Sequence, residues 1–259
     1  MTCLDRLKQK IENKELVVGS IVNLKDYSVS EMFGSYGFDF LWIDAEHAPF
    51  DKNDIYMHIM TASSGNTASF IRIPWNDPVI VKPILEMGPD GIIFPGIRTV
   101  EEAELAIKSC MYPPKGIRGF GPRRCTGYGA IPQDEYIKNG HKLLWKILQV
   151  EHVDCVNNLE EIVQIEGVDA LLLGPNDLSA SIGLLGQSDH PEVMKLIEMT
   201  GKIARKYNKP LGVFTGDDPA NIQKWMDLGV NWVTIGGDTG YLSAARKSLQ
   251  KVRKAFESK

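Results

Sequence analysis

Short apolar runs alternate with longer amphipathic stretches along the whole chain. The runs are rich in β-branched and aromatic residues and are continuous rather than alternating, which is typical of parallel strands buried on both faces. There are eight of them: LVVGSIV, FDFLWID, TASFIRI, DGIIFPG, LLWKILQVE, VDALLLG, PLGVFTG and VNWVTIGG. Each run predicts one strand of a parallel sheet.

Helix-like segments separate these runs, and capping residues stand where the helices should begin. We expect helices over residues 77–86, 100–110, 191–207 and 219–228, and an amphipathic last helix over residues 242–258. Asp77 and Asp218 each precede a proline, and Thr99 precedes an acidic first turn, as is common at helix N-termini. Eight strand–helix units in 259 residues predict an α/β protein, a single (β/α)8 TIM barrel domain over residues 1–259. The doubly wound alternative is weaker, because no GxGxxG follows the first strand.

Residues 112–144 (YPPKGIRGFGPRRCTGYGAIPQDEYIKNGHKLL) break this rhythm between the fourth and fifth strands. The segment is rich in Gly, Pro and Arg and is far longer than a usual connection, and long barrel loops are usually functional. Arg118, Arg123 and Arg124 lie there among glycines. They could contact an anionic group of a ligand, or they could be solvated loop charges.

Composition narrows the classes of partner. The formal net charge is −4 and no Lys/Arg-rich run is present, which argues against nucleic acid and anionic membranes and favours a small molecule. The four cysteines are widely spaced without CxxC, as expected for reduced thiols. No apolar run reaches the roughly 18 residues of a membrane span, and the N-terminus is too charged for a signal peptide. These features predict a cytoplasmic protein.

Titratable side chains follow several of the predicted strands. In a barrel, reactive groups belong at the C-terminal ends of the strands, which share one face. The chain places Asp44 and His47, Arg72, Gln149 and Glu151, and Asp177 at such positions. We therefore expect one pocket to hold them.

Glu151 and Asp177 each follow an apolar strand, where an unpaired carboxylate is costly to bury. They belong to neighbouring predicted strands, and an oxygen-rich set without Cys or clustered His suits Mg²⁺ or Mn²⁺ rather than zinc. Salt-bridged or capping carboxylates are the alternative. Asp177 in particular could cap a helix that begins at LSASIG.

Arg72 lies between two isoleucines and needs an anionic partner. That partner is either a carboxylate inside the barrel or a substrate carboxylate, which the guanidinium fork can bind in a bidentate manner. His58, His141, His152 and His190 lack an arranged partner, so we expect core or surface roles for them. Lys146 lies early in its strand, and this position disfavours a Schiff-base mechanism.

Five motifs together resemble the HpcH/HpaI-type hydroxy-oxo-acid aldolases. These enzymes are class II pyruvate aldolases within the pyruvate/phosphoenolpyruvate-binding barrel superfamily. The motifs run over nearly the whole chain: IDAEHAP, RIPWNDP, YPPKGIRGFG, LQVE and EGVDALLLGPNDLSASIG. The resemblance implies metal-dependent cleavage and condensation of 4-hydroxy-2-oxo acids to pyruvate and an aldehyde, through a pyruvate enolate.

The resemblance also implies roles for individual residues. A divalent ion (Mg²⁺, Mn²⁺ or Co²⁺) would bind Glu151 and Asp177, and would be chelated by the carboxylate and keto oxygen of pyruvate. Arg72 would contact the enolate oxygen, and His47, paired with Asp44, would manage protons through a bound water. Three residues after the sixth strand, Gly174, Pro175 and Asn176, would seat pyruvate together with Gln149.

The resemblance further implies a homo-oligomer, typically a hexamer built as a trimer of dimers with an exchanged C-terminal helix. The chain departs from the family pattern at Ala45, where family members have Gly, and in the more basic stretch GPRRCTGYG. Arg123 and Arg124 in that stretch could favour an acidic aldehyde. Two rival functions remain: an oxaloacetate decarboxylase or other enolate lyase of the superfamily, and a non-catalytic oxo-acid-binding barrel.

Overall fold

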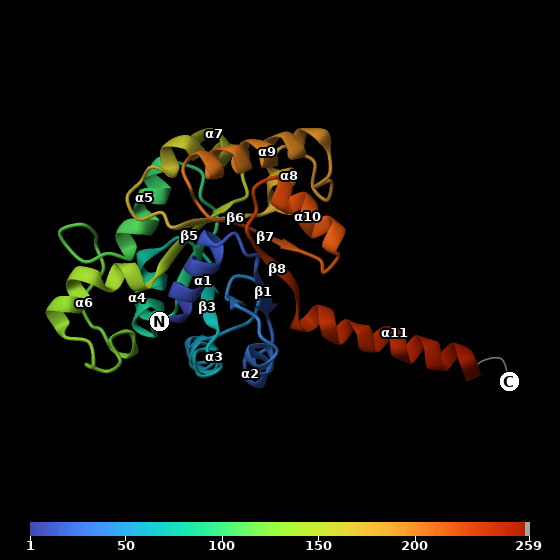
Figure 1. The fold of residues 1–259 in the computed structure, drawn as a ribbon, viewed down its shortest axis with the longest axis horizontal. Coiled ribbons are helices and arrows are strands. Elements are labelled where there is room, and N and C mark those ends of the chain that lie inside the picture. The colour runs from blue at the N-terminus through green and yellow to red at the C-terminus, as the bar shows by residue number, and fades with distance from the viewer. Residues whose placement is uncertain (257–259) are drawn as a thin grey trace.

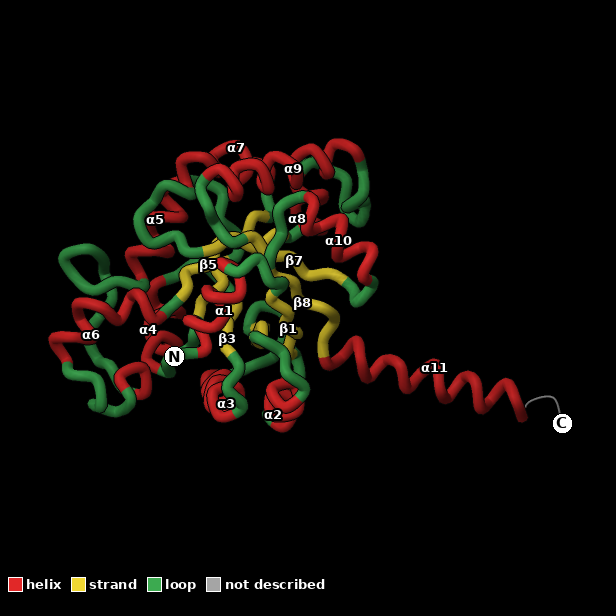
Figure 2. Tube along the Cα trace, viewed as in Figure 1, coloured by secondary structure: helices red, strands yellow, loops and turns green. Residues whose placement is uncertain are grey.

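The computed structural model describes residues 1–256 as a closed barrel of eight parallel strands surrounded by helices (Figures 1 and 2). The strands are neighbours in chain order, and β8 pairs with β1. They are β1 (Val17–Val22), β2 (Phe40–Asp44), β3 (Ala68–Arg72), β4 (Gly91–Phe94), β5 (Trp145–Val150), β6 (Ala170–Leu173), β7 (Leu211–Thr215) and β8 (Trp232–Gly237). The predicted (β/α)8 barrel is confirmed, and each apolar run contains one strand.

The helices follow the strands as the capping pattern predicts. They are α1 (Cys3–Glu12), α2 (Ser28–Ser35), α3 (Lys52–Ser64), α4 (Pro78–Glu86), α5 (Val100–Ser109), α6 (Gln133–Asn139), α7 (Val153–Ile162), α8 (Pro175–Ser181), α9 (Pro191–Lys206), α10 (Pro219–Asp227) and α11 (Asp238–Phe256). Asp77, Thr99 and Asp218 accept backbone N–H groups as N-caps. The last helix begins at Asp238 rather than Leu242, and Ser258 lies outside the described residues. None of the helices in residues 1–256 is long and apolar enough to cross a bilayer.

Large aromatic side chains fill the inside of the barrel. The rings of Phe40 and Phe70 stack with centroids 5.1 Å apart, and Trp232 meets Phe40 edge-on at 5.4 Å. Glycines on neighbouring strands leave room for these rings, since a Cβ on Gly19 would lie 2.3 Å from Phe40 and one on Gly212 2.1 Å from Trp232. The interior is therefore a packed core, and a ligand has to bind at one end of it.

A repeated clamp joins the strands in pairs at their N-terminal end. An Asp or Asn lies just before each even-numbered strand. Its backbone N–H donates to the backbone carbonyl oxygen of a residue near the start of the preceding strand, and its side-chain oxygen accepts the backbone N–H of that same residue. The two hydrogen bonds are 2.8–3.1 Å long in each clamp. The four pairs are Asp39 with Val18, Asp90 with Ser69, Asp169 with Lys146, and Asn231 with Leu211.

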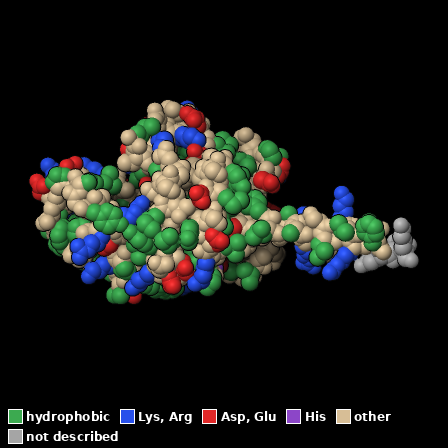
Figure 3. All heavy atoms as spheres, turned by 90° about the horizontal axis from the view of Figure 1, so that it is seen from below, with side chains coloured by type: hydrophobic (Ala, Val, Ile, Leu, Met, Phe, Trp, Pro, Cys, Tyr) green, Lys and Arg blue, Asp and Glu red, His purple; other side chains and the backbone are tan. Residues whose placement is uncertain are grey.

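Helix α11 leaves the barrel instead of packing beside α2 (Figure 1). Hydrophobic and basic side chains lie along its exposed length (Figure 3). Its large apolar residues Leu242, Leu249, Val252 and Phe256 are spaced seven, three and four positions apart, which places them on one face of the helix, and all four are at least half exposed. At the foot of the helix, α2 and β1 form an apolar groove of about 690 Å³, which also contains the side chains of Tyr241 and Leu242.

The long segment 112–144 connects α5 to β5, so it lies at the N-terminal end of the barrel. Arg118 anchors it from a buried position: its Nη2 lies 3.1 Å from a carboxylate oxygen of Glu86 at the end of α4, and 3.3 Å from the Tyr136 hydroxyl. The segment is thus on the opposite end of the barrel from the C-terminal ends of the strands.

Removing the side chain of one clamp should test its contribution. We expect Asp90→Ala to lower the free energy of unfolding by about 1–3 kcal/mol, because the Ser69 N–H loses its partner. Asp90→Asn should stay close to the wild type, since Asn231 performs the same task with an amide. Urea unfolding checks both, with Asp134→Ala on the surface of α6 as control. Equal losses in both Asp90 variants would mean that the charge, rather than the hydrogen bond, stabilises the pair.

Candidate active site

The polar residues predicted at the strand ends do lie together at the C-terminal end of the barrel. Asp44 is the last residue of β2 and Arg72 the last of β3, and the two are directly opposite in the parallel register. Gln149 lies in β5 with Glu151 just after it, and Asp177 lies in α8, which follows β6. Closure of the sheet brings these four chain segments to one rim.

Arg72 is the centre of a buried charge network. Its Nε and Nη2 donate to the two carboxylate oxygens of Asp44 at 2.8 and 2.7 Å, and its Nη1 lies 3.0 Å from Glu46 Oε2. The guanidinium carbon lies 4.7 Å from the centroid of the Trp42 ring. Burial raises the pKa of Glu46, and the charge of Arg72 opposes that rise. The internal salt bridge is therefore real, and it holds Arg72 in a fixed orientation.

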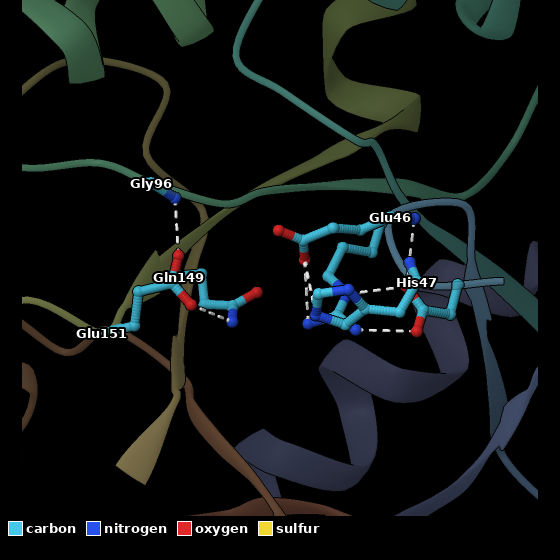
Figure 4. A network of polar contacts seen from close by, with 7 residues as sticks. Glu46, His47, Gly96, Gln149 and Glu151 are labelled. Carbon is cyan, nitrogen blue, oxygen red and sulfur yellow. Dashed lines mark hydrogen bonds and ion pairs between the residues drawn. The ribbon is translucent and has the colours of Figure 1, made fainter. Parts of the chain in front are cut away.

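His47 does not pair with Asp44 as predicted. Both carboxylate oxygens of Asp44 accept hydrogen bonds from Arg72. The Oδ1 atom of Asp44 also accepts the backbone N–H groups of Glu46 and His47, at 3.2 and 3.4 Å. The His47 side chain is 69% exposed, and its Nε2 lies 3.8 Å from Glu46 Oε2. Glu46 is thus the carboxylate beside the imidazole (Figure 4). The proposed Asp44–His47 dyad is corrected on this point.

Glu151 is held by hydrogen bonds on both carboxylate oxygens. The Gly96 N–H donates to Oε1 at 2.6 Å, and the Gln149 side-chain amide donates to Oε2 (Figure 4). Gly174 packs against this pair, since a Cβ there would lie 2.8 Å from Glu151 Cβ. Burial raises the pKa of Glu151, and the nearby charges of Glu46 and Asp177 raise it further.

This set of groups fits a hard divalent cation. Glu46, Glu151 and Asp177 are close enough that each acidic neighbour raises the pKa of Glu46 or Glu151, so a positive ion would relieve their repulsion. Asp177 is the third residue of α8, whose N-cap is Gly174, so it does not cap the helix. Within residues 1–256, no three His, Cys, Asp or Glu side chains enclose a metal by themselves. Water and substrate oxygens would complete the coordination, as is usual for Mg²⁺.

Two hollows open at this rim. The first, which we call the barrel hollow, measures about 680 Å³ and is lined by Arg72, Gln149 and Gly174 among others. The second, the side hollow, measures about 410 Å³ and is lined among others by Glu46 and Glu151. His47 and Asp177 line both. A ligand held near these two side chains can extend into either hollow.

The arginines of the long segment do not reach either hollow of the same protomer. Arg124 Nη1 donates to the carbonyl oxygens of Met87 and Gly88 at 2.9 and 3.1 Å, at the N-terminal end of the barrel. Arg123 lines a separate surface hollow beside Tyr128. The predicted aldehyde contact of Arg123 and Arg124 is therefore wrong within one protomer. The reason is that this segment follows α5, not β4.

The structure adds residues that the sequence reasoning missed. Asp238 is buried at the start of α11, and its Oδ2 accepts the backbone N–H groups of Asn23 and Leu24, both at 2.8 Å. Trp75 and Arg98 line the side hollow. All of them lie in segments that follow a strand's C-terminal end, so the positional rule that selected Asp44 and Arg72 would have selected them too.

Comparisons with known proteins agree with this geometry. The sequence model of the family described as HpcH/HpaI aldolase/citrate lyase matches residues 19–245. The chain belongs to this family. It is 33% identical to a 5-keto-4-deoxy-D-glucarate aldolase of Klebsiella pneumoniae over 98% of this chain and 97% of that protein. The Escherichia coli K12 protein of the same name is 33% identical over 95% of each chain.

Solved structures of family members have the same fold. The HpcH/HpaI aldolase from Desulfitobacterium hafniense is 28% identical, with a TM-score of 0.88 over 95% of this chain and 96% of that one. A family protein from Burkholderia cenocepacia is 30% identical, with a TM-score of 0.87 over 96% and 99% of the two chains. The resemblance inferred from the motifs is confirmed, and this HpcH/HpaI family member is a carbon–carbon lyase of the aldolase type.

Neutralising one carboxylate should test the cation site without any activity measurement. At pH 7 without metal, we expect Glu151→Gln to melt at a higher temperature than the wild type, because one repelling charge is removed. The Gln149 amide can flip to present its unpartnered Oε1 to the new side chain. Mg²⁺ should raise the melting temperature of the wild type more than that of the variant. Glu161→Gln, on the exposed face of α7, is the control. An equal Mg²⁺ response in all three proteins would remove Glu151 from the cation site.

Proposed function

We propose that this family member catalyses the metal-dependent cleavage of 4-hydroxy-2-oxo acids to pyruvate and an aldehyde, and the reverse condensation. The observation that carries the proposal is the fixed Arg72 facing the same hollow as Gln149, Gly174 and Asp177, with Glu151 adjoining. An ion on Glu151 and Asp177, namely Mg²⁺, Mn²⁺ or Co²⁺, would supply Lewis-acid stabilisation of negative charge on oxygen. No lysine lines either hollow among the described residues, so the proposal includes no imine.

Arg72 is suited to the charge that develops during the reaction. Cleavage breaks the bond between C3 and C4, and the electron pair of that bond becomes the enolate of pyruvate. The guanidinium has N–H groups beyond the three nitrogen contacts to Asp44 and Glu46, and these can donate to the enolate oxygen. Because Arg72 is already oriented, little reorganisation is needed as charge forms.

His47 is suited to the proton transfers. Cleavage requires a base to take the proton of the C4 hydroxyl, and condensation returns it. The imidazole borders both hollows and is exposed to water, so it can act directly or through a water molecule. We assign its orientation to Glu46 rather than to Asp44, because Glu46 is the carboxylate next to its Nε2. Gln149 and the turn of Gly174, Pro175 and Asn176 would seat the pyruvate half.

Exchange of the methyl protons of pyruvate in D₂O tests the proposal without knowledge of the aldehyde. We expect NMR to detect exchange with Mg²⁺ or Mn²⁺, and its loss on adding a chelator or in Glu151→Ala. Glu161→Ala should exchange like the wild type. In cleavage assays, His47→Ala should be slower by about 100-fold or more. Full exchange in the presence of chelator would refute the metal-dependent mechanism, whereas no exchange with any metal would favour an oxo-acid-binding protein without catalysis.

We also propose a homo-oligomer in which α11 of one protomer lies in the apolar groove of another. The apolar stripe of α11 and the groove beside α2 are both exposed in one protomer, and a patch of this kind marks an interaction site. A hexamer is the assembly that the family resemblance implies. The relatives are named as enzymes acting on a sugar acid, and small molecules are the partners proposed for this chain as well.

Charged substitutions on the α11 stripe should break this assembly. Leu249→Glu combined with Val252→Glu places two carboxylates on the apolar face, and we expect a smaller particle in light scattering coupled to gel filtration. Lys247→Glu lies on the opposite face of the helix and should leave the mass unchanged. An unaltered mass in the double variant, or a monomeric wild type, would exclude helix exchange.

A further inference from the structure

The Arg72 guanidinium packs against an aromatic ring. Trp42 lies two residues before Asp44 in β2, so the two side chains point to the same side of the sheet. The guanidinium carbon of Arg72 lies 4.7 Å from the centroid of the Trp42 ring. Trp42 and Arg72 are both buried, and both line the barrel hollow. Trp42 also packs with Phe40 and Phe70 in the core inside the barrel. The indole thus connects this core to the charge of Arg72.

The polar edge of this indole has no partner. Among residues 1–256, the buried Nε1 of Trp42 makes no hydrogen bond. A buried N–H without a partner lowers stability, and a leucine or phenylalanine at this position would avoid that cost. A hydrogen bond therefore does not account for a tryptophan here. The ring face does, because an indole attracts a cation more strongly than the ring of tyrosine or phenylalanine.

The same ring helps to keep water away from Arg72. Arg72 is only 7% exposed, since Asp44 and Glu46 bind its nitrogens and Trp42 packs against it. Phe214 of β7 meets Trp42 edge-on, with ring centroids 6.5 Å apart, and adds to the apolar lining of the barrel hollow. A charge shielded from water acts more strongly on a neighbouring charge. A smaller side chain at position 42 would leave a gap beside the guanidinium that water can fill.

We propose that Trp42 is a positioning residue for enolate formation: its ring holds the Arg72 guanidinium in place and excludes water, so that the free N–H groups stabilise the enolate oxygen. The inference rests on the proposed function, which places the enolate at Arg72. The indole itself exchanges no proton or electron with the substrate. The enolate oxygen carries more negative charge than the keto oxygen of bound pyruvate. Loss of the ring therefore slows the reaction without weakening pyruvate binding.

Exchange of the methyl protons of pyruvate in D₂O with Mg²⁺ measures this step. We expect Trp42→Leu to lower kcat for exchange by about tenfold, with KM for pyruvate within about twofold of the wild type. Trp42→Phe and Trp42→Tyr keep a ring beside the guanidinium and should be slower by about threefold or less. Trp42→Met replaces the leucine variant if that variant does not fold.

Trp232→Phe is the matched control. Trp232 is also buried inside the barrel with an Nε1 that makes no hydrogen bond among the described residues. It packs on Phe40 and Phe70 rather than on an arginine. We expect this variant to exchange protons at the wild-type rate. Its melting temperature should resemble that of Trp42→Phe, because each variant loses the same volume and one unpaired N–H.

Binding of oxalate separates positioning from packing without turnover. Oxalate is a planar dianion that resembles the enolate of pyruvate. With Mg²⁺ present, calorimetric titration should show about tenfold weaker binding of oxalate to Trp42→Leu than to the wild type, and little change for pyruvate.

The outcomes distinguish the two proposals. An unchanged kcat in Trp42→Leu, or equal losses of oxalate and pyruvate affinity, overturns the role of Trp42 while the proposed function stands. If Trp232→Phe is as slow as the variants at position 42, the loss comes from packing of the core, and the role of Trp42 is overturned as well. If the wild type exchanges no pyruvate protons with any metal, the proposed function fails, and the role of Trp42 fails with it.

Discussion

Closure of the parallel sheet is the constraint on which the rest of this molecule depends. Hydrogen bonds between β8 and β1 complete the ring and leave no free edge. The clamps at the N-terminal end fix pairs of strands in register, and a one-residue slip would turn every inward side chain outward. The same register sets Asp44 opposite Arg72 at the other end. The hydrogen bonds at the N-terminal end of the barrel therefore maintain the strand register that positions the polar residues at the C-terminal end.

The charged residues at the C-terminal end of the barrel differ in whether a residue of opposite charge compensates them. Arg72 is neutralised by two carboxylates and supported by an indole ring, whereas Glu151 and Asp177 have no cationic side chain bonded to them among the described residues. Asp177 is exposed to water, but Glu151 is partly buried, and a partly buried carboxylate without such a partner destabilises the fold. Sites that carry uncompensated charge of this kind are characteristic of function rather than of stability.

The sequence predicted the barrel well because its signals are local. Continuous apolar runs and N-caps such as Asp77, Thr99 and Asp218 depend on neighbouring residues in the chain. The rule that reactive groups lie at the C-terminal ends of barrel strands also predicted that Arg72, Glu151 and Asp177 lie at one rim. It could not decide which carboxylate each cation would contact, because Asp44 and Glu46 both lie within three residues of His47 in the chain and the choice depends on the three-dimensional geometry. In the structure the imidazole of His47 lies beside Glu46, whereas the resemblance implied Asp44 as its partner.

Two other features depend on long-range packing and could not be predicted from the local sequence pattern. The long segment between α5 and β5 was expected near the site because of its arginines, yet the alternation of strands and helices already puts an α-to-β connection at the opposite end. The amphipathic pattern of α11 predicted a helix with an apolar face. It gave no indication that this face would point away from the barrel of its own protomer.

The first turn of α11 takes part in two surfaces at once. Thr239 and Gly240 line the barrel hollow, while Tyr241 and Leu242 line the apolar groove. Asp238 ties this turn to the loop after β1. A force that shifts the helix therefore also shifts one wall of the barrel hollow. In the proposed assembly, association of protomers and occupancy of the hollow would be linked equilibria, so dilution of the protein would change its affinity for small molecules.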